Sequence, residues 1–342
     1  MKQVFQRILI FFLILALILS IFVGILIGSV SIEPQKIWGI LLHEMGFPIQ
    51  ETWMEGERLI IISLRAPRAL AAAIVGAMLG IAGVAAQGLF RNPIAEPYII
   101  GISSAAGFGT ALIVGFGLLF LGIFTIPIIS FTFALIAVII VYGLSQTRFR
   151  LSLSALLLSG IALSFFFSAA TSFILYLSED QTHNILSYLM GSFWGVSWIE
   201  VYIMFCVLIP STIALFYYAR DLNLIVFGDE TAQTTGVKVE QSKKIILFIM
   251  TILASTSVAF CGSIGFVGLI IPHTMRLIVG SDHRKLIPIA AIGGGILLVW
   301  ADVISRSLIS PLEIPVGIFI ALLGGPFFVY LVVKRKKGGN FV

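Results

Sequence analysis

Apolar runs long enough to cross a lipid bilayer recur from one end of this 342-residue sequence to the other. A helix needs about 20 apolar residues to cross roughly 30 Å of hydrocarbon. Every backbone N–H and C=O within that layer must be hydrogen-bonded inside the protein, which leaves helices as the usual solution. Only 11% of the residues are charged, whereas soluble domains carry about 25%. The sequence therefore predicts an all-α polytopic membrane protein.

Ten runs of this kind fit the sequence, and residues 1–342 are predicted to form one transmembrane domain, a ten-span helical bundle. The predicted spans are residues 8–30, 66–87, 99–119, 122–143, 153–176, 200–219, 244–262, 264–280, 286–305 and 315–333. The eighth run is short and contains Pro272. The first run is too long for the core of a cleaved signal peptide, so we expect it to be retained as a span.

The basic residues are distributed unevenly between the two sides of this bundle. Cytoplasmic loops of membrane proteins carry an excess of Lys and Arg. If both termini are cytoplasmic, 16 of the 21 basic residues lie on that side. The five on the outside are Lys36, Arg58, Arg65, Arg68 and Arg306. The sequence therefore predicts a multi-pass protein of the cell membrane with both termini in the cytoplasm.

The stretch SLRAPRALAAAIVGA, residues 63–77, places two of those outer arginines at the start of a span. Pro67 between them suits the first turn of a helix and predicts a rigid corner, while Arg306 ends the ninth span at the same level. Clustered guanidinium groups can bind the carboxylates of a substrate or of a docking protein. Two other interpretations stay open: the arginines extend to the lipid headgroups, or Arg306 pairs with Asp302 at i,i+4 spacing.

The inner segment 220–243 is too apolar for a solvated linker. Apolar residues dominate 222–227, a turn is expected at Gly228, and a short helix-like piece then ends at Gly236. The segment is therefore predicted to form a helical hairpin. Such a hairpin commonly binds a soluble partner, and a helix lying on the lipid surface is the alternative.

Few ionisable side chains lie deep in the predicted spans, with Asp302 as the exception. Ion-coupled carriers usually need such groups, so this scarcity argues against that mechanism. The motif Gly76-x-x-x-Gly80 with Gly83 predicts close helix packing. The four histidines are scattered, and neither a Walker A sequence nor a metal-type cysteine spacing is present. No catalytic, metal or ATP site is predicted, although a self-sufficient carrier or channel and an intramembrane enzyme remain the alternative classes.

Three long segments resemble one family, the iron-siderophore, haem and vitamin B12 permeases of ABC importers. RAPRALAAAIVGAMLGIAGVAAQGLFRNPIAEPYIIGISSAAGFG is similar to the family's second and third spans. GSIGFVGLIIPHTMRLIVGSDHRKLIPIAAIGGG is similar to its eighth and ninth, and PLEIPVGIFIALLGGPFFVYLV to its last. The resemblance covers nearly the whole chain and implies a ten-span bundle with both termini cytoplasmic, in agreement with the distribution of basic residues.

The resemblance also implies roles for matching residues. Arg65, Arg68 and Arg306 match arginines that face glutamates on an extracytoplasmic binding protein. Residues 228–237 match the segment that couples the permease to its ATPase, and two turns match those that close the cytoplasmic gate. The coupling residues are Gly228, Asp229, Glu230, Thr231, Ala232, Gly236 and Val237, and the gate residues are Asn92, Pro93, Ile94, Leu153 and Ser154. The fifth and tenth spans would line the central path.

A family member works with several partners. The resemblance implies a second permease copy or a sister permease, two cytoplasmic ATPases, and the binding protein, all around a chain embedded in the bilayer. ATP and Mg²⁺ would bind the ATPases, so this chain is expected to be a transport subunit with no cofactor, no catalytic activity and no nucleic-acid partner. A ferric siderophore is the first expected substrate, with haem and cobalamin as alternatives.

Overall fold

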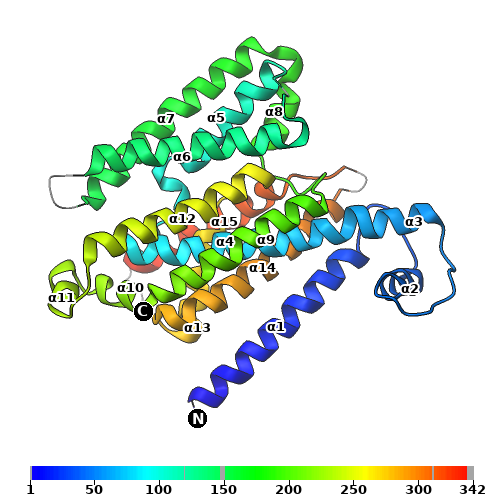
Figure 1. The fold of residues 1–342 in the computed structure, drawn as a ribbon, viewed down its shortest axis with the longest axis horizontal. Coiled ribbons are helices and arrows are strands. Elements are labelled where there is room, and N and C mark those ends of the chain that lie inside the picture. Colours follow the sequence, from blue (N-terminus) through cyan, green and yellow to red (C-terminus); the bar gives the residue numbers. More distant parts are fainter. Residues whose placement is uncertain (1, 119, 147–150, 310–311, 337–342) are drawn as a thin grey trace.

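The computed structural model is an assembly of helices joined by short loops (Figure 1). It describes residues 2–118, 120–146, 151–309 and 312–336. Among these residues, seven helical segments are long and apolar enough to cross a membrane, and three shorter apolar helices accompany them. Each of the ten predicted spans coincides with one of these segments, and the all-α class is confirmed. That all ten cross a membrane remains a prediction.

The helices have the following bounds. The long segments are α1 (Lys2–Leu26), the continuous run of α3 (Glu55–Leu59), η1 (Ile60–Arg65) and α4 (Ala66–Leu89), then η3 (Gly122–Phe124) with α6 (Thr125–Ser145), α7 (Leu153–Leu177), α9 (Trp198–Tyr217), α12 (Val239–Cys261) and α14 (His283–Ser307). The shorter apolar helices are α5 (Ile102–Gly115), α13 (Val267–Val279) and α15 (Val316–Lys336). The remaining elements are α2 (Pro34–Glu44), η2 (Pro97–Ile100), η4 (Glu179–Gln181), α8 (Thr182–Leu189), α10 (Ala219–Val226) and α11 (Asp229–Thr234).

Helix α4 lies at the centre of the bundle and is buried along almost its whole length. It packs against α14, α12 and α13. A Cβ atom added at Gly76 would lie 2.1 Å from the carbonyl oxygen of Gly294, and one at Gly83 would lie 2.0 Å from that of Gly268. These glycines let the backbones touch, which confirms the predicted packing role of the motif.

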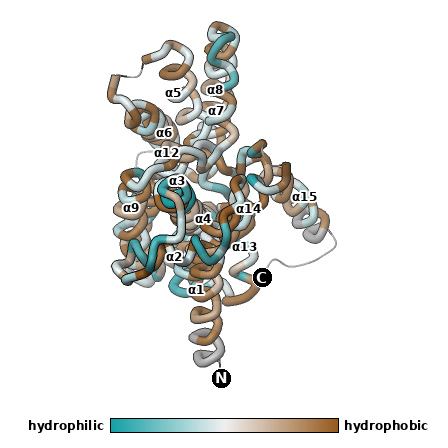
Figure 2. Tube along the Cα trace, turned by 90° about the vertical axis from the view of Figure 1, so that its right-hand side faces the viewer, coloured by the Kyte–Doolittle hydropathy of each residue, from teal (hydrophilic) through white to brown (hydrophobic). Residues whose placement is uncertain are grey.

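The connecting segments sort into two ends of the bundle. One end carries α2 and α3, at the right of Figure 1, and the other carries α10 and α11, at the left. Figure 2 looks onto the α2–α3 end, where hydrophilic segments gather over helices that are largely hydrophobic. Segments predicted to be outside meet there, as when Trp198 Nε1 donates to the carbonyl of Ile62 at 2.8 Å. Segments predicted to be inside meet at the other end, where Asn223 Nδ2 donates to Asp282 at 2.7 Å.

The partition of the loops therefore agrees with the distribution of basic residues. The side of the membrane that each end faces stays a prediction. Arg148, Arg150 and Lys337, three of the residues in that count, lie outside the described residues.

The predicted corner at Pro67 is wrong, because a continuous helix runs from Glu55 to Leu89. Proline lacks an N–H, and its ring clashes with the carbonyl four residues earlier in a regular α-helix. Here the turn before it is widened, since the backbone N–H of Ala66 donates to the carbonyl of Ile61, five residues back. This π-type segment allows the helix to continue through the proline.

Helices α5 and α13 begin next to each other inside the bundle. At 1.5 Å per residue they are only about 20 Å long, less than the roughly 30 Å of hydrocarbon. Ser103 Oγ donates to Ser263 Oγ at 2.6 Å, and a Glu96 carboxylate oxygen accepts from the backbone N–H of Phe266 at 2.5 Å. The short helix η2 and Gly101 precede α5, and a non-helical segment, residues 262–266, precedes α13, so the predicted spans 99–119 and 264–280 are α-helical over only part of their length.

Candidate functional site

The α2–α3 end of the bundle contains a buried network of acidic and basic side chains. Arg68, in the first turn of α4, donates to Asp302 Oδ1 through Nη2 at 2.8 Å and through Nε at 3.0 Å. Its Nη1 donates to Glu313 at 2.7 Å. Arg306 Nε lies 3.6 Å from Asp302 Oδ2, while Nη2 donates to the carbonyl of Gly24 at 2.6 Å. The predicted i,i+4 pair is confirmed, and the Asp302 carboxylate, 2% exposed, is shared by two guanidinium groups.

Arg65 binds the carboxyl-terminal end of α1. Its Nη1 donates to the carbonyls of Ile25 at 3.2 Å and Leu26 at 3.0 Å, and its Nη2 donates to the carbonyl of Val30. The last carbonyls of a helix have no partners within it, and the helix dipole favours a positive charge at that end. Gly28 leaves room for the guanidinium, because a Cβ there would lie 2.5 Å from Arg65 Nε. Arg65 therefore connects α1 to the start of α4.

The structure brings the three predicted docking arginines together around a pocket of about 420 Å³, which Trp194 and Glu313 also line. Arg65 and Arg306 are only 5% and 3% exposed. Extension to the lipid headgroups does not fit side chains buried in this way. Several of their N–H groups already bind acceptors within the chain, whereas Arg306 Nε has no hydrogen-bond acceptor among the described residues. The docking role stays a prediction.

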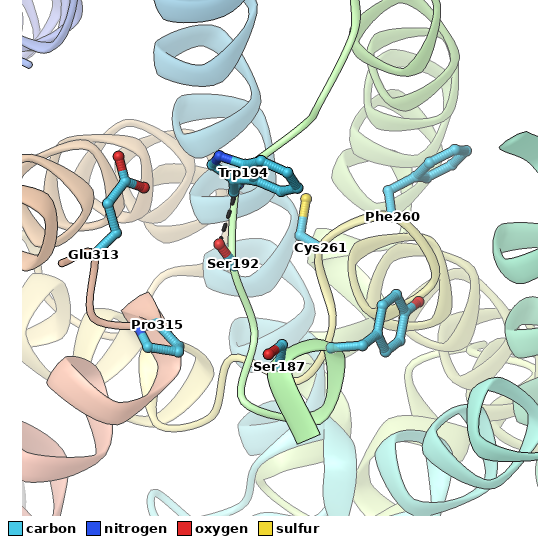
Figure 3. A pocket seen from close by; sticks show the side chains of 8 residues that line it. Ser187, Ser192, Trp194, Phe260, Cys261, Glu313 and Pro315 are labelled. Carbon is cyan, nitrogen blue, oxygen red and sulfur yellow. Dashed lines mark hydrogen bonds between the residues drawn. The ribbon is translucent and has the colours of Figure 1, made fainter. Parts of the chain in front are cut away.

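A second pocket, of about 410 Å³, lies at the same end between residues 187–194, the end of α12 and the start of α15 (Figure 3). Its lining combines the aromatic rings of Tyr188, Trp194 and Phe260 with the carboxylate of Glu313. The indole of Trp194 is 78% exposed. Because Trp194 and Glu313 line both pockets, the arginine network and this aromatic pocket are neighbouring parts of one outer surface.

The opposite end presents the helical hairpin that was predicted for residues 220–243. Helices α10 and α11 are joined at Gly228 (φ 128°), and the turn after α11 contains Gly236 (φ 87°). The hairpin buries Leu222, Ile225 and Ala232 within the bundle. Phe227 is 78% exposed, and Glu230 is exposed. Because the apolar face packs on the protein, the hairpin leaves a mixed polar and apolar face for a partner rather than an apolar face for lipid.

Among the predicted coupling residues, Asp229 has the most contacts with charged groups of the bundle. Its carboxylate binds the guanidinium of Arg91 and the ammonium group of Lys243, the latter at 2.5 Å. Thr231 and Gly236 are exposed, and Val237 is half-buried. The coupling segment is thus attached to the bundle through Asp229 and the buried Ala232, and exposed at Glu230, Thr231 and Gly236.

The two predicted gate turns lie at the same end as the hairpin. In the first, Asn92 Oδ1 accepts from the backbone N–H of Ile94 at 3.2 Å, which fixes the turn through a local side-chain bond. In the second, Ser152 Oγ caps α7 just before Leu153 and Ser154. A pocket of about 540 Å³ lies between the first turn and α10. Whether these turns form a gate remains a prediction.

Sequence reasoning did not identify three charged residues with central contacts: Glu313, Lys243 and Glu96. Glu313 is the one acidic residue between the last two predicted spans, which was an available signal. Lys243 follows Glu240 by three residues at the start of a span, a spacing that favours a helical ion pair. For Glu96 no local signal indicates that its carboxylate binds the start of α13, 170 residues away.

Comparison with known proteins gives a consistent result. A family model described as the FecCD transport family matches residues 14–334. The cobalamin import system permease protein BtuC of Halobacterium salinarum is 38% identical over 299 residues, covering 87% of this chain and 80% of that protein. The hemin transport system permease protein HmuU of Yersinia pestis is 35% identical over 339 residues, covering 98% of each. A solved structure described as an inward-facing conformation of a metal-chelate type ABC transporter has a TM-score of 0.82 at 32% identity, covering 96% of this chain and 99% of that one.

Proposed function

The chain belongs to the FecCD transport family of ABC importer permeases, and we propose that it carries a metal chelate inward, with a ferric siderophore as the first candidate substrate. As a permease subunit it is not an enzyme. The similarity to a metal-chelate type transporter over 96% of the chain carries the proposal. Haem and cobalamin are the alternatives, because the named hemin and cobalamin permeases resemble this chain about equally.

The pocket in Figure 3 supports a bulky solute with both apolar and polar surface. Aromatic walls provide contact area, and a small number of polar groups orient a ligand. The three rings and the Glu313 carboxylate supply these two features. A metal chelate with exposed donor groups fits such a lining.

In the proposed assembly this chain pairs with a second copy of itself or with a sister permease, and two cytoplasmic ATPases and an extracytoplasmic binding protein complete the importer. The exposed face of the α10–α11 hairpin supports ATPase docking. Helices α7 and α15, the fifth and tenth predicted spans, would face the second copy and line the path. Much of α7 is uncovered in the single chain, including Leu158 and Phe165 at 70% and 74% exposure. In this arrangement both termini and the hairpin lie in the cytoplasm.

The pocket lined by the three arginines is the proposed docking site for the binding protein. A substitution of Glu313 tests this role. Arg68 binds Glu313, whose carboxylate is 27% exposed, so an incoming carboxylate would compete with it. We expect Glu313→Gln to tighten the complex severalfold at low salt, because desolvated charge pairs at interfaces couple by about 1.5 kcal/mol or more. Arg68→Gln should weaken it. Unchanged affinity in both variants, measured in nanodiscs at low and high salt, would remove the docking role.

Reconstitution tests the transport proposal directly. The permease, its ATPase and its binding protein would be placed in proteoliposomes and supplied with a ferric siderophore, hemin or cobalamin. We expect ATP-dependent accumulation of one chelate, and no accumulation when the ATPase is omitted or ADP replaces ATP. Accumulation by the permease alone would show a self-sufficient carrier, and ATP-driven uptake of only hemin or cobalamin would replace the siderophore assignment.

A further inference from the structure

We propose that a four-residue ion network connects the coupling helix α11 to both gate turns and transmits its movement to them. The network consists of Arg91, Asp229, Glu240 and Lys243. The inference rests on the proposed function, because α11 has a movement to transmit only if an ATPase docks on it. The contacts themselves belong to the chain alone and can be tested without transport.

Asp229 is the branch point of the network. It is the first residue of α11, and its two carboxylate oxygens bind different elements: Oδ1 binds Arg91, and Oδ2 binds Lys243 on α12 at 2.5 Å. Arg91 directly precedes the first gate turn, Asn92–Ile94. One carboxylate on the coupling helix therefore contacts both the residue next to the first gate turn and a long helix of the bundle.

The second branch runs from Lys243 through Glu240 to the other gate turn. Lys243 Nζ lies 3.4 Å from one oxygen of Glu240, and the other oxygen accepts from the backbone N–H of Leu151 at 2.7 Å. Leu151 is buried and lies two residues before Leu153. The gate turn at the start of α7 is thus bound to the same set of charges as the turn after α4.

Burial of Lys243 makes the connection resistant to separation. The residue is 1% exposed, and a buried ammonium group is tolerated only when it is paired and hydrogen-bonded. If Asp229 moved away alone, Lys243 would keep only the longer contact to Glu240. The two acidic and two basic side chains balance in charge. The network is therefore more stable when its four residues move together than when they separate.

The backbone of the first gate turn adds an independent observation. Arg91 has φ 51°, one of two non-glycine residues with positive φ among the described residues. This conformation is uncommon for a residue with a side chain, and such residues persist where surrounding contacts hold them. The bond to Asp229 is one such contact, so release of Asp229 should allow the 91–94 turn to relax.

Hydrogen exchange of the permease alone distinguishes transmission from a local structural role. In Asp229→Asn the amide keeps the size of the carboxylate but loses its charge. We expect backbone exchange at the amides of residues 91, 92, 94 and 151–154 to rise at least about tenfold, since charge-assisted bonds are lost. Asp221→Asn is the matched control, because Asp221 lies in the same hairpin and, among the described residues, accepts from the neutral hydroxyl of Ser242 rather than pairing with a charged group. Exchange changes confined to α11 would overturn the proposal.

A second variant is used if Asp229→Asn does not fold because the buried Lys243 has lost its main acidic partner. Asp229→Asn combined with Lys243→Met removes both charges, a change that buried pairs often tolerate. In the reconstituted complex we expect chelate uptake per ATP hydrolysed to fall at least about tenfold in this double variant. Uptake per ATP equal to wild type would refute transmission. If the wild-type complex carries no chelate, the transport proposal fails, and the exchange experiment still decides the network.

Discussion

Replacing Asp302 by asparagine should destabilise the chain strongly, because this carboxylate sits between two buried arginines. Its side chain is 2% exposed, accepts from Arg68 at 2.8 Å and lies 3.6 Å from Arg306. Removing one partner of a buried ion pair costs about 3–5 kcal/mol. Arg68 keeps its 2.7 Å bond to Glu313, so we expect the lower limit, about 3 kcal/mol. At about 2.1 cal/mol/K per residue, this corresponds to a Tm lower by about 4 °C.

Thermal unfolding of the purified permease in nanodiscs, followed by tryptophan fluorescence, measures this shift. Glu313→Gln is the matched control, because it removes a second carboxylate from the same arginine at a site that is 27% exposed. Partly exposed pairs are worth at most about 1 kcal/mol, so its Tm should fall by about 1 °C. A Glu313→Gln variant that loses as much stability as Asp302→Asn would refute the claim that burial sets the cost.

Three further predictions concern packing, orientation and pH. Gly76→Leu should abolish the monodisperse peak in size-exclusion chromatography, since its Cβ would meet an α14 carbonyl at 2.1 Å, whereas Gly143→Ala, with open space at its Cβ, should behave as wild type. Lys238→Cys, in a background without the native thiols, should react with an impermeant maleimide only after the cells are permeabilised; labelling of intact cells would reverse the orientation. Burial acts to raise the pKa of Asp282, but hydrogen bonds from Asn223 and a backbone N–H, with nearby positive charges, hold it below its usual value. Asp282 therefore stabilises the fold above its unfolded pKa of about 3.9, and this contribution is lost as pH falls through the lower folded pKa. The fall in stability of Asp282→Asn with decreasing pH should therefore be less steep than that of the wild type. An unchanged dependence of stability on pH would contradict the assignment.

Local features of the sequence predicted the parts of the site that depend on local interactions. The i,i+4 spacing of Asp302 and Arg306 was sufficient to predict their pairing. Glycines at 228 and 236 were sufficient to predict where the inner hairpin turns and where its second helix ends. Apolar runs were sufficient to locate the helices, because the free energy of transferring a segment into an apolar layer depends on that segment's own side chains and backbone.

The predicted corner at Pro67 fails for a different reason. A proline preceded by apolar residues is compatible with a helix start and with a helix that continues through a widened turn. The choice depends on whether residues 55–65 find partners to pack against. Ile61 is fully buried, so tertiary packing supports the upstream helix.

Only the tertiary structure decided what the charged residues bind. Arg68 meets Glu313 across 245 residues of sequence, and Arg91 meets Asp229 across 138. Hydropathy and charge indicate which end of the bundle a residue belongs to, and that much was read from the sequence alone. Which acid faces which base at that end depends on how closely the helices approach and at what register, and the contact of Gly76 with Gly294 sets this for α4 and α14. An ion pair needs its charged atoms within about 4 Å of each other, so residues assigned to the correct end still needed the folded backbone to acquire their partners.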